Sequence, residues 1–473
     1  MQKSKPLYAK VYDLLRTRIL AGIYKKGYNI PSHQVLCEEF QVSDITIRKV
    51  LKMLEDDGFI ETVQGRKAKV IYNKTNMNLV PLNSNHILDS LKSLKVLFSP
   101  FILYSIENCL TKEDYSQLCD CVNSMFLDEE KVYDFWVRLN YFWSSILHSV
   151  QNTCLNRIIE YTKYTDLFYI QGCSYELRLK ELCNLKELLQ SISSHCFTPD
   201  KIQFPMLYSC ANHLKQGHTY YTLKNSSLLM PANEIALYLR YTVPVYQLIY
   251  IDTILQIEKG DYLKGDFLPT YEQMKKKYDV SISTIQQTVK KLRETGVIYS
   301  DKWSHLQIAV TAEQVIKLQA ANGELAKRLK FYAETIQIVT FTIEETAALA
   351  VKSVSPQKIF ELSEHLTLKF EQKSIDYWGL YKTLLEFITE YIPFHLLKQI
   401  YSIILKDYAH GKGIASYIRT NKSAYFNFEK LHNCIKALKQ SDLEQFAKEI
   451  KKISQAVYEI AVYNYENINH WLK

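Results

Sequence analysis

QVSDITIRKVLKMLEDDGFIE, residues 41–61, recurs in altered form as DVSISTIQQTVKKLRETGVIY, residues 279–299. Each stretch has a serine after a valine, then apolar residues at three- and four-residue spacing, then a glycine. This pattern predicts an amphipathic helix that is capped by the serine and ends near the glycine. The second stretch keeps the frame but replaces Arg48 and Lys49 with Gln286 and Gln287. The chain therefore repeats one structural unit and changes its charge.

The repeat extends well beyond these two stretches. At a constant offset of 238 residues, identities fall on turn and core positions: Pro6 and Pro244, Gly22 and Gly260, Tyr24 and Tyr262, Gly27 and Gly265, Pro31 and Pro269, Gly58 and Gly296. A fainter similarity links TKEDYSQL from Thr111 to SPQKIFEL from Ser355. Internal repetition on this scale indicates a tandem duplication of two units, in the order A-B-A′-B′.

A chain of 473 residues has room for roughly three or four domains. We expect a mainly α protein with four of them, at residues 1–75, 76–238, 239–312 and 313–473. Residues 73–86 are polar and predict a linker. The second and fourth domains are poor in Gly and Pro, so both should be all-helical, and the run after Val310 predicts one helix without a turn.

The first domain shows the element order of a winged helix-turn-helix. A first helix over residues 7–21 buries one apolar face, and Ser32 is placed to cap a short second helix. The third helix, capped by Ser43, should bury Ile45, Val50, Leu51 and Leu54. FIETVQGRKAKVIY, residues 59–72, predicts two short strands around a basic tip.

Such a domain presents short polar and basic side chains to double-stranded DNA. Residues 1–75 hold 14 Lys or Arg against 8 Asp or Glu, so most of the net charge of +8 lies there. Arg48 and Lys49 can neutralise phosphates, whereas Thr46 and Gln34 can read base edges. The full set of candidate DNA-binding residues is Ser32, Gln34, Ser43, Asp44, Thr46, Arg48, Lys49, Gln64, Gly65, Arg66 and Lys67.

These elements resemble the GntR family of bacterial transcription regulators, in the Pro-Leu-Tyr start, the Gly-x-Tyr-x-x-Gly turn, Val-Ser-x-x-Thr and Gly-Phe-Ile. The resemblance covers about 70 residues of the first copy and implies that Ser43, Thr46, Arg48, Gly65 and Arg66 touch DNA. Asp44 and Gln34 stand where relatives often carry Arg. The operator sequence therefore does not follow from the resemblance.

The second copy keeps Ser281 and Thr284 but has Gln286 and Gln287 in place of the basic pair. Residues 244–310 carry 9 basic against 8 acidic side chains, compared with 11 against 8 over residues 6–72. Losing phosphate contacts weakens DNA binding strongly. A scaffold or protein-interaction role is favoured for this copy, and DNA reading by it stays open.

The helical domains are similar to the effector domain of the FadR branch of the family, known as the FCD type. That resemblance implies a small-molecule effector, whose identity the residues do not give. The metal-binding Phe-His pair of that type reads Phe142-Trp143 here, and His148, His195, His213 and His218 lack ligand spacing, so no metal is expected. We expect the two helical domains to form an intramolecular pseudo-dimer, and a further homodimer stays open.

Composition limits the remaining functions. The longest apolar runs are too short to span a membrane, and the charged N-terminus is unlike a signal peptide, so a cytoplasmic protein is expected. The ten cysteines should be reduced and mostly buried. Only 13 glycines argue against a fused pyridoxal-phosphate aminotransferase-like domain, and no catalytic residue or cofactor motif is found. A replication initiator with tandem winged helices is the main alternative.

Overall fold

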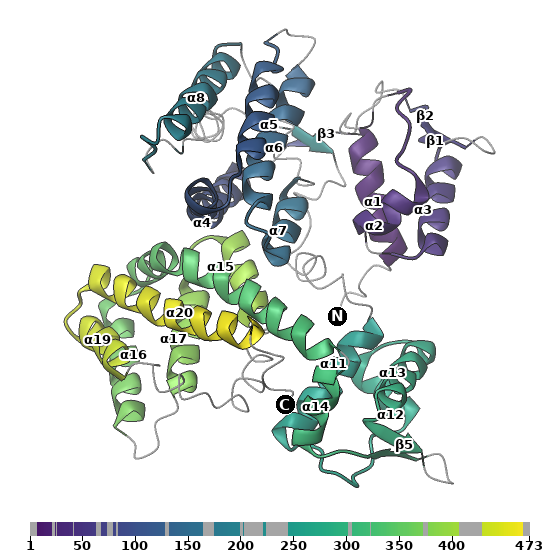
Figure 1. Ribbon diagram of the computed structural model, residues 1–473, viewed down its shortest axis with the longest axis vertical. Coiled ribbons are helices and arrows are strands. Elements are labelled where there is room, and N and C mark those ends of the chain that lie inside the picture. Colours follow the sequence, from purple (N-terminus) through teal and green to yellow (C-terminus); the bar gives the residue numbers. More distant parts are fainter. Residues whose placement is uncertain are drawn as a thin grey trace. The chain divides into compact units, whose positions relative to one another are not determined.

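The structure is a computed structural model in which the chain divides into two compact units, residues 1–242 and 243–473 (Figure 1). It describes residues 7–20, 24, 26–40, 42–62, 68–72, 79–81, 84–127, 132–163, 175–198, 202, 221–223, 245–300, 305–321, 323–371, 377–405 and 428–466. The described part is mainly helical, as predicted.

The first unit begins with a winged helix, residues 7–72, and continues as a helical domain. The winged helix consists of α1 (Leu7–Leu20), α2 (His33–Phe40), α3 (Asp44–Asp56), β1 (Ile60–Glu61) and β2 (Lys69–Val70). The remaining elements are β3 (Leu79–Pro81), α4 (Ser84–Asn108), α5 (Lys112–Asn123), α6 (Val132–His148), α7 (Thr153–Lys163), α8 (Tyr175–Ser193) and β4 (Tyr221–Leu223).

The core of the first winged helix lies between α1, α2, α3 and the short sheet. α3 contributes Ile47, Val50, Leu51 and Leu54, which pack with Val11, Leu15, Ile19 and Leu36. The prediction that Ile45 is buried was wrong, since 80% of it is exposed. Residues 47, 50, 51 and 54 share one helical face at 3.6 residues per turn, and residue 45 lies on the opposite side.

The second unit starts with a second winged helix, residues 245–310, followed by another set of helices. Its winged helix consists of α11 (Val245–Lys259), α12 (Tyr271–Tyr278), α13 (Ile282–Glu294), β5 (Ile298–Ser300) and β6 (Leu306–Ile308). After it come α14 (Ala312–Ala321), α15 (Glu324–Lys352), α16 (Pro356–Phe370), α17 (Tyr377–Tyr391), a helical stretch at 395–405, α19 (Phe428–Lys439) and α20 (Leu443–Glu466).

The two winged helices share backbone hydrogen bonds at the predicted offset of 238 residues. The Gly27 N–H donates to the Val70 carbonyl at 2.7 Å, and the Gly265 N–H donates to the Ile308 carbonyl at 3.0 Å. α12 and α13 begin and end at the residues that correspond to the ends of α2 and α3. The isolated bridge Asn29–Lys69 recurs as Phe267–Gln307. The second copy therefore keeps the backbone framework of the first.

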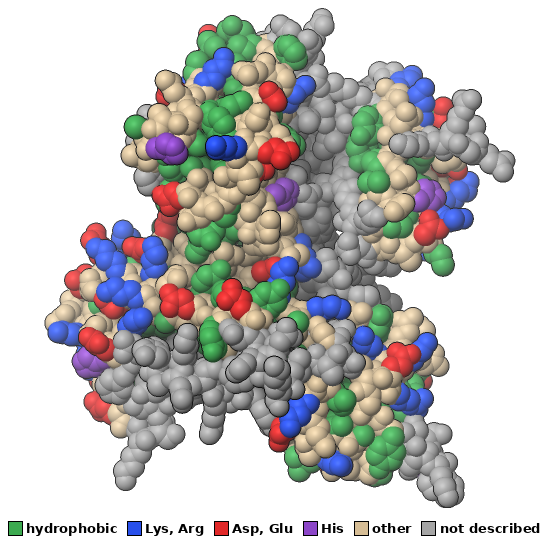
Figure 2. Space-filling model, viewed as in Figure 1, with side chains coloured by type: hydrophobic (Ala, Val, Ile, Leu, Met, Phe, Trp, Pro, Cys, Tyr) green, Lys and Arg blue, Asp and Glu red, His purple; other side chains and the backbone are tan. Residues whose placement is uncertain are grey.

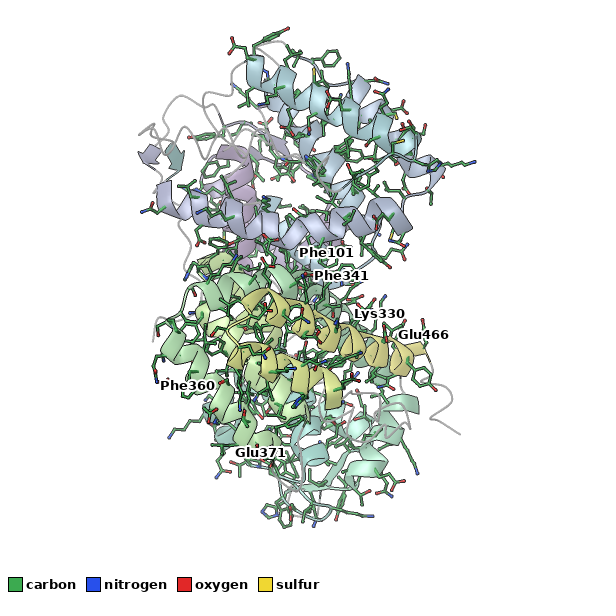
Figure 3. The ribbon with its side chains drawn as sticks, turned by 90° about the vertical axis from the view of Figure 1, so that its left-hand side faces the viewer. Phe101, Lys330, Phe341, Phe360, Glu371 and Glu466 are labelled. Carbon is green, nitrogen blue, oxygen red and sulfur yellow. The ribbon has the colours of Figure 1, made fainter. Side chains whose placement is uncertain are left out.

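In the helices of the second unit, α15 packs along α20. Figure 3 shows the two side by side, with Lys330 of α15 and Glu466 of α20 at the same end of the pair. Buried hydroxyl groups connect neighbouring helices to this pair: Tyr401 Oη lies 2.6 Å from Thr342 Oγ1 of α15, and Tyr381 Oη of α17 lies 2.7 Å from Ser454 Oγ of α20. These bonds satisfy hydroxyl groups that would otherwise be costly to bury.

Three expectations about the helical domains need correction. The first is not all-helical, because β3, inside the segment predicted as a linker, pairs with β4 through Val80 and Thr222. The run after Val310 is two helices, because Gly323 adopts φ 70°, a left-handed conformation that separates α14 from α15. Among the eight described cysteines, Cys121, Cys154 and Cys434 are buried, and the other five are partly or fully exposed.

Candidate nucleic-acid interface

Two serines set the beginnings of α2 and α3. Ser43 Oγ accepts from the Thr46 N–H at 3.3 Å, and Ser32 Oγ accepts from the Val35 N–H at 3.4 Å. Both caps agree with the sequence prediction. His33 at the start of α2 lies 3.0 Å from Asp44 at the start of α3, so the polar side chains at the two N-termini share one surface. The N–H groups and the dipole at the start of the 13-residue helix α3 favour a phosphate nearby.

The outward side of α3 carries the predicted basic pair. The Arg48 side chain is 70% exposed, Lys49 is exposed, and Thr46 is half-buried beside the cap. Lys49 Nζ sits 3.4 Å from the centroid of the Tyr8 ring on α1, a cation–π contact that holds the ammonium group near the middle of α3. Gln34 is exposed on the first turn of α2.

Asp44 forms polar contacts with two neighbours. Its Oδ1 lies 3.0 Å from His33 Nδ1, and its Oδ2 accepts a hydrogen bond from Arg48 Nε at 2.6 Å. The bond to His33 and then the bond to Arg48 lower the pKa of Asp44, because both stabilise the carboxylate. Figure 2 shows basic, acidic and histidine side chains next to one another on this winged helix, at the upper right. His33, Asp44 and Arg48 form what we call the α3 triad.

Two residues of this surface escaped the sequence reasoning. His33 directly follows the Ser32 cap, and its role depends on a carboxylate on another helix. Ile45 is exposed beside Asp44, where an apolar side chain can contact a thymine methyl group. The spacing of Ile47, Val50 and Leu54 would have revealed the exposure of Ile45.

The wing residues Gln64, Gly65, Arg66 and Lys67 lie outside the described residues. The strands that flank them are in place, with Ile60 opposite Val70 and Glu61 opposite Lys69. The two strands predicted on either side of the wing are therefore present and paired.

The second winged helix keeps the serine cap of its recognition helix and lacks the two cations that follow it in the first. Ser281 Oγ accepts from the Thr284 N–H at 3.3 Å, as Ser43 does in the first copy. Gln286 and Gln287 are exposed at the positions of Arg48 and Lys49. The positions of His33 and Asp44 are taken by Tyr271 and Ile282. The recognition helix of this copy thus has the same frame without cations at these two positions, although its last turns keep Lys290, Lys291 and Arg293.

The exposed side of the second sheet is aromatic. Phe267, Gln307 and Tyr299 lie side by side across the strands, and Phe267 and Tyr299 are 56% and 48% exposed. The ring of His305 meets the Phe267 ring edge-on at 5.6 Å. In the first copy the same row is Asn29, Lys69 and Glu61. The second winged helix therefore has two aromatic side chains in the row where the first has only polar and charged ones.

The described residues offer neither a metal-binding cluster nor a membrane-spanning helix. No group of three or more His, Cys, Asp or Glu side chains there could hold a metal ion. No described helix combines the length and the apolarity that crossing a membrane requires.

Comparison with known proteins finds matches over the first winged helix. Residues 7–70 match the family described as bacterial regulatory proteins, gntR family. Over 93 residues the chain is 31% identical to the HTH-type transcriptional repressor YtrA of Bacillus subtilis (strain 168), covering 20% of this chain and 71% of YtrA. The chain belongs to the GntR family. The family match lies on the first winged helix, which also contains the α3 triad.

Another curated relative and a solved structure are also similar to the chain. The chain is 34% identical over 80 residues to the mannosyl-D-glycerate transport/metabolism system repressor MngR of Escherichia coli (strain K12), covering 17% of this chain and 33% of MngR. It thus spans about a third of the length of that GntR relative. The solved structure of E. coli McbR/YncC aligns over 47% of this chain and 99% of its own, with 16% identity and a TM-score of 0.25.

Proposed function

We propose that this GntR-family chain is a bacterial transcription regulator that binds double-stranded DNA through its first winged helix. The observation that carries this proposal is the surface of α3: a serine-capped N-terminus followed by the exposed side chains of Arg48 and Lys49, within the region that matches the family. The relatives YtrA and MngR are described as repressors, which supports a regulatory role.

In this proposal α3 enters the major groove. Arg48 and Lys49 neutralise phosphates or reach base edges, and Thr46 and Gln34 lie close enough to the helix starts to contribute polar contacts. Ser32 and Ser43 hold the helix starts, and Gln64, Gly65, Arg66 and Lys67 of the wing approach the backbone or the minor groove. Asp44 contributes through its contacts with His33 and Arg48 in the α3 triad.

The second winged helix serves as a scaffold in this proposal. Its Gln286 and Gln287 cannot replace phosphate-neutralising cations, and its backbone framework is intact. The repeated hydrogen bonds at a 238-residue offset support a tandem duplication, in which residues 1–75 and 239–312 are winged helices and residues 76–238 and 313–473 are FCD-like helical domains. The helical domains would then form an intramolecular pseudo-dimer.

The helical domains are also the proposed place for regulation. A small effector bound there would alter how the first winged helix is presented to DNA in the cytoplasm, and a homodimer would present two such readers. The relatives MngR and YtrA are described as repressors, and we propose no catalytic activity and no cofactor for this chain.

A matched pair of variants in the full chain tests the proposal. Genomic footprinting with the wild-type protein first yields a bound duplex, and gel-shift titrations then compare Arg48→Ala with Gln286→Ala at the equivalent position of the second copy. Arg48→Ala should abolish retention of that duplex, whereas Gln286→Ala should leave it nearly unchanged. Equal losses would overturn the asymmetry between the copies, and a wild-type chain that bound no genomic fragment in dilute buffer would overturn DNA binding itself.

A further inference from the structure

We propose that Asp44 is a positioning residue, which holds Arg48 in one orientation and so sets the sequence specificity of the first winged helix. This inference rests on the proposed DNA-binding function. An acidic side chain beside the groove is expected to weaken binding, because it repels phosphate. The contacts that Asp44 makes with His33 and Arg48 give it a second role.

The hydrogen bond to Asp44 uses only one edge of the Arg48 guanidinium. Nε donates to Asp44 Oδ2 at 2.6 Å, and neither terminal nitrogen is bonded to another residue that the structure describes. The side chain is 70% exposed, so its terminal N–H groups face solvent. Those two groups form the fork that bonds guanine O6 and N7, the commonest base-specific contact of arginine. Asp44 therefore restrains the side chain without occupying its base-reading end.

His33 fixes the carboxylate from another direction. Its Nδ1 lies 3.0 Å from Asp44 Oδ1, so the two carboxylate oxygens are held by side chains from two helices, α2 and α3. A carboxylate held at both oxygens has little freedom to rotate. An arginine bonded to it is pre-organised, and less conformational freedom is lost when it meets a base.

The second winged helix shows that the α3 triad is not needed for the fold. All three positions differ there, as Tyr271, Ile282 and Gln286. The capping contacts are nevertheless kept, and α13 spans the same positions as α3. The copy that lost the cations lost their acidic partner and the histidine as well. This joint loss is expected if the three side chains act together on DNA.

The α3 triad also weakens binding to DNA of arbitrary sequence while it favours a contact with one base. Asp44 cancels much of the attraction that Arg48 exerts on any phosphate, while it leaves a directed pair of donors for one base. Removal of the carboxylate charge should thus strengthen binding to arbitrary DNA and weaken discrimination. If Asp44 acted only by repelling phosphate, removal of its charge would change the affinity for a specific duplex and the affinity for arbitrary DNA in the same direction.

The test compares Asp44→Asn with Asp56→Asn in the full chain. Asp56 is an exposed acid at the other end of the same helix, paired with Lys52, and its replacement removes an equal charge far from Arg48. Dissociation constants are measured for the duplex recovered by footprinting and for a mixed-sequence duplex of equal length. Asp44→Asn should bind the mixed duplex severalfold more tightly and lower the ratio between the two affinities by about tenfold. Asp56→Asn should leave that ratio unchanged.

An Arg48→Ala background provides the second readout, titrated at low salt, where the remaining phosphate contacts still retain DNA that this variant releases at moderate salt. There Asp44→Asn should no longer alter the ratio, because the side chain that it positions is gone, and circular dichroism should show equal helix content in all variants. An unchanged ratio for Asp44→Asn, or an equal change in the Arg48→Ala background, would overturn the positioning role. Those results leave the proposed function intact, whereas failure of the wild-type chain to bind DNA would remove both.

Discussion

Arg328 and Glu258 form a two-pronged ion pair that joins α15 to α11. Arg328 Nη1 donates to Glu258 Oε1 at 3.1 Å and Nη2 donates to Oε2 at 3.2 Å, with the side chains 10% and 0% exposed. α14 also packs against both helices. The second winged helix is therefore attached to its own helices by a buried, bidentate contact. A domain held in this way is well placed to act as a scaffold.

Replacement of Arg328 should destabilise the second unit. Arg328→Ala leaves the buried Glu258 carboxylate without its partner, so we expect the free energy of unfolding to fall by about 3 kcal/mol. Urea denaturation of the full chain measures this. Lys317→Ala is the control, because its pair with Glu313 is exposed and should contribute under about 1 kcal/mol. Similar small effects for both variants would contradict a structural role for the buried pair.

The salt dependence of DNA binding should distinguish the two copies. Lys49→Ala should reduce the slope of log affinity against log salt by about 1, because one phosphate contact is lost. Gln287→Ala, at the equivalent position of the second copy, should leave the slope unchanged. Filter-binding titrations at several salt concentrations provide the measurement. If Gln287→Ala lowers the slope equally, the second copy also lies on the phosphate backbone.

Replacement of the two capping serines should distinguish an effect on stability from an effect on DNA binding. Ser43→Ala and Ser281→Ala each remove a hydrogen bond to the first turn of a recognition helix, and each should lower stability by about 1 kcal/mol. Only Ser43→Ala should also weaken DNA binding, since only that helix carries Arg48 and Lys49. Thermal unfolding and gel shifts on the same preparations would show this. Weakening by both variants would place both helices on DNA.

Alkaline pH should destabilise the second unit through Tyr401. Burial raises the pKa of Tyr401 to about 12, from an ordinary value of 10.0, although bonds with Thr342 and Thr346 counteract part of this rise. The folded state thus retains a proton that the unfolded state releases. The resulting stability is fully present below pH 10 and is lost as the pH rises towards 12.

Tyr401→Phe tests this linkage. The variant should be less stable at neutral pH, because it loses its bonds to the two threonines, but its stability should fall less steeply above pH 10. Urea midpoints across that pH range measure the slope. The exposed Tyr299, replaced by Phe, serves as a control and should keep the wild-type slope. An unchanged slope in Tyr401→Phe would contradict the role of its burial.

Much of the first winged helix could be predicted from the sequence, because its signals are local. Ser43 caps its own helix, the hairpin strands flank a polar tip, and the repeated glycines mark the turns in both copies. Prediction failed where one residue was assigned to the wrong helical face, as with Ile45. It also failed at Gly323, whose left-handed conformation interrupts a run of good helix formers.

The α3 triad and the β3–β4 pairing were beyond sequence reasoning for a different reason. Val80 and Thr222 are separated by well over a hundred residues, and no local sequence pattern predicts that they pair. Asp44 suggested only a repulsive charge, because its contact with His33 depends on how α2 packs against α3.

The sequence by itself determined that one winged-helix framework recurs 238 residues along the chain and that the basic pair Arg48 and Lys49 is absent from the second occurrence, since caps, apolar spacing and charge are properties of neighbouring residues. Only the tertiary structure decided which side chains meet. Arg48 is held through Asp44 and His33, and the second winged helix is joined to its helices through Arg328 and Glu258, because those contacts exist only once separate helices have packed together.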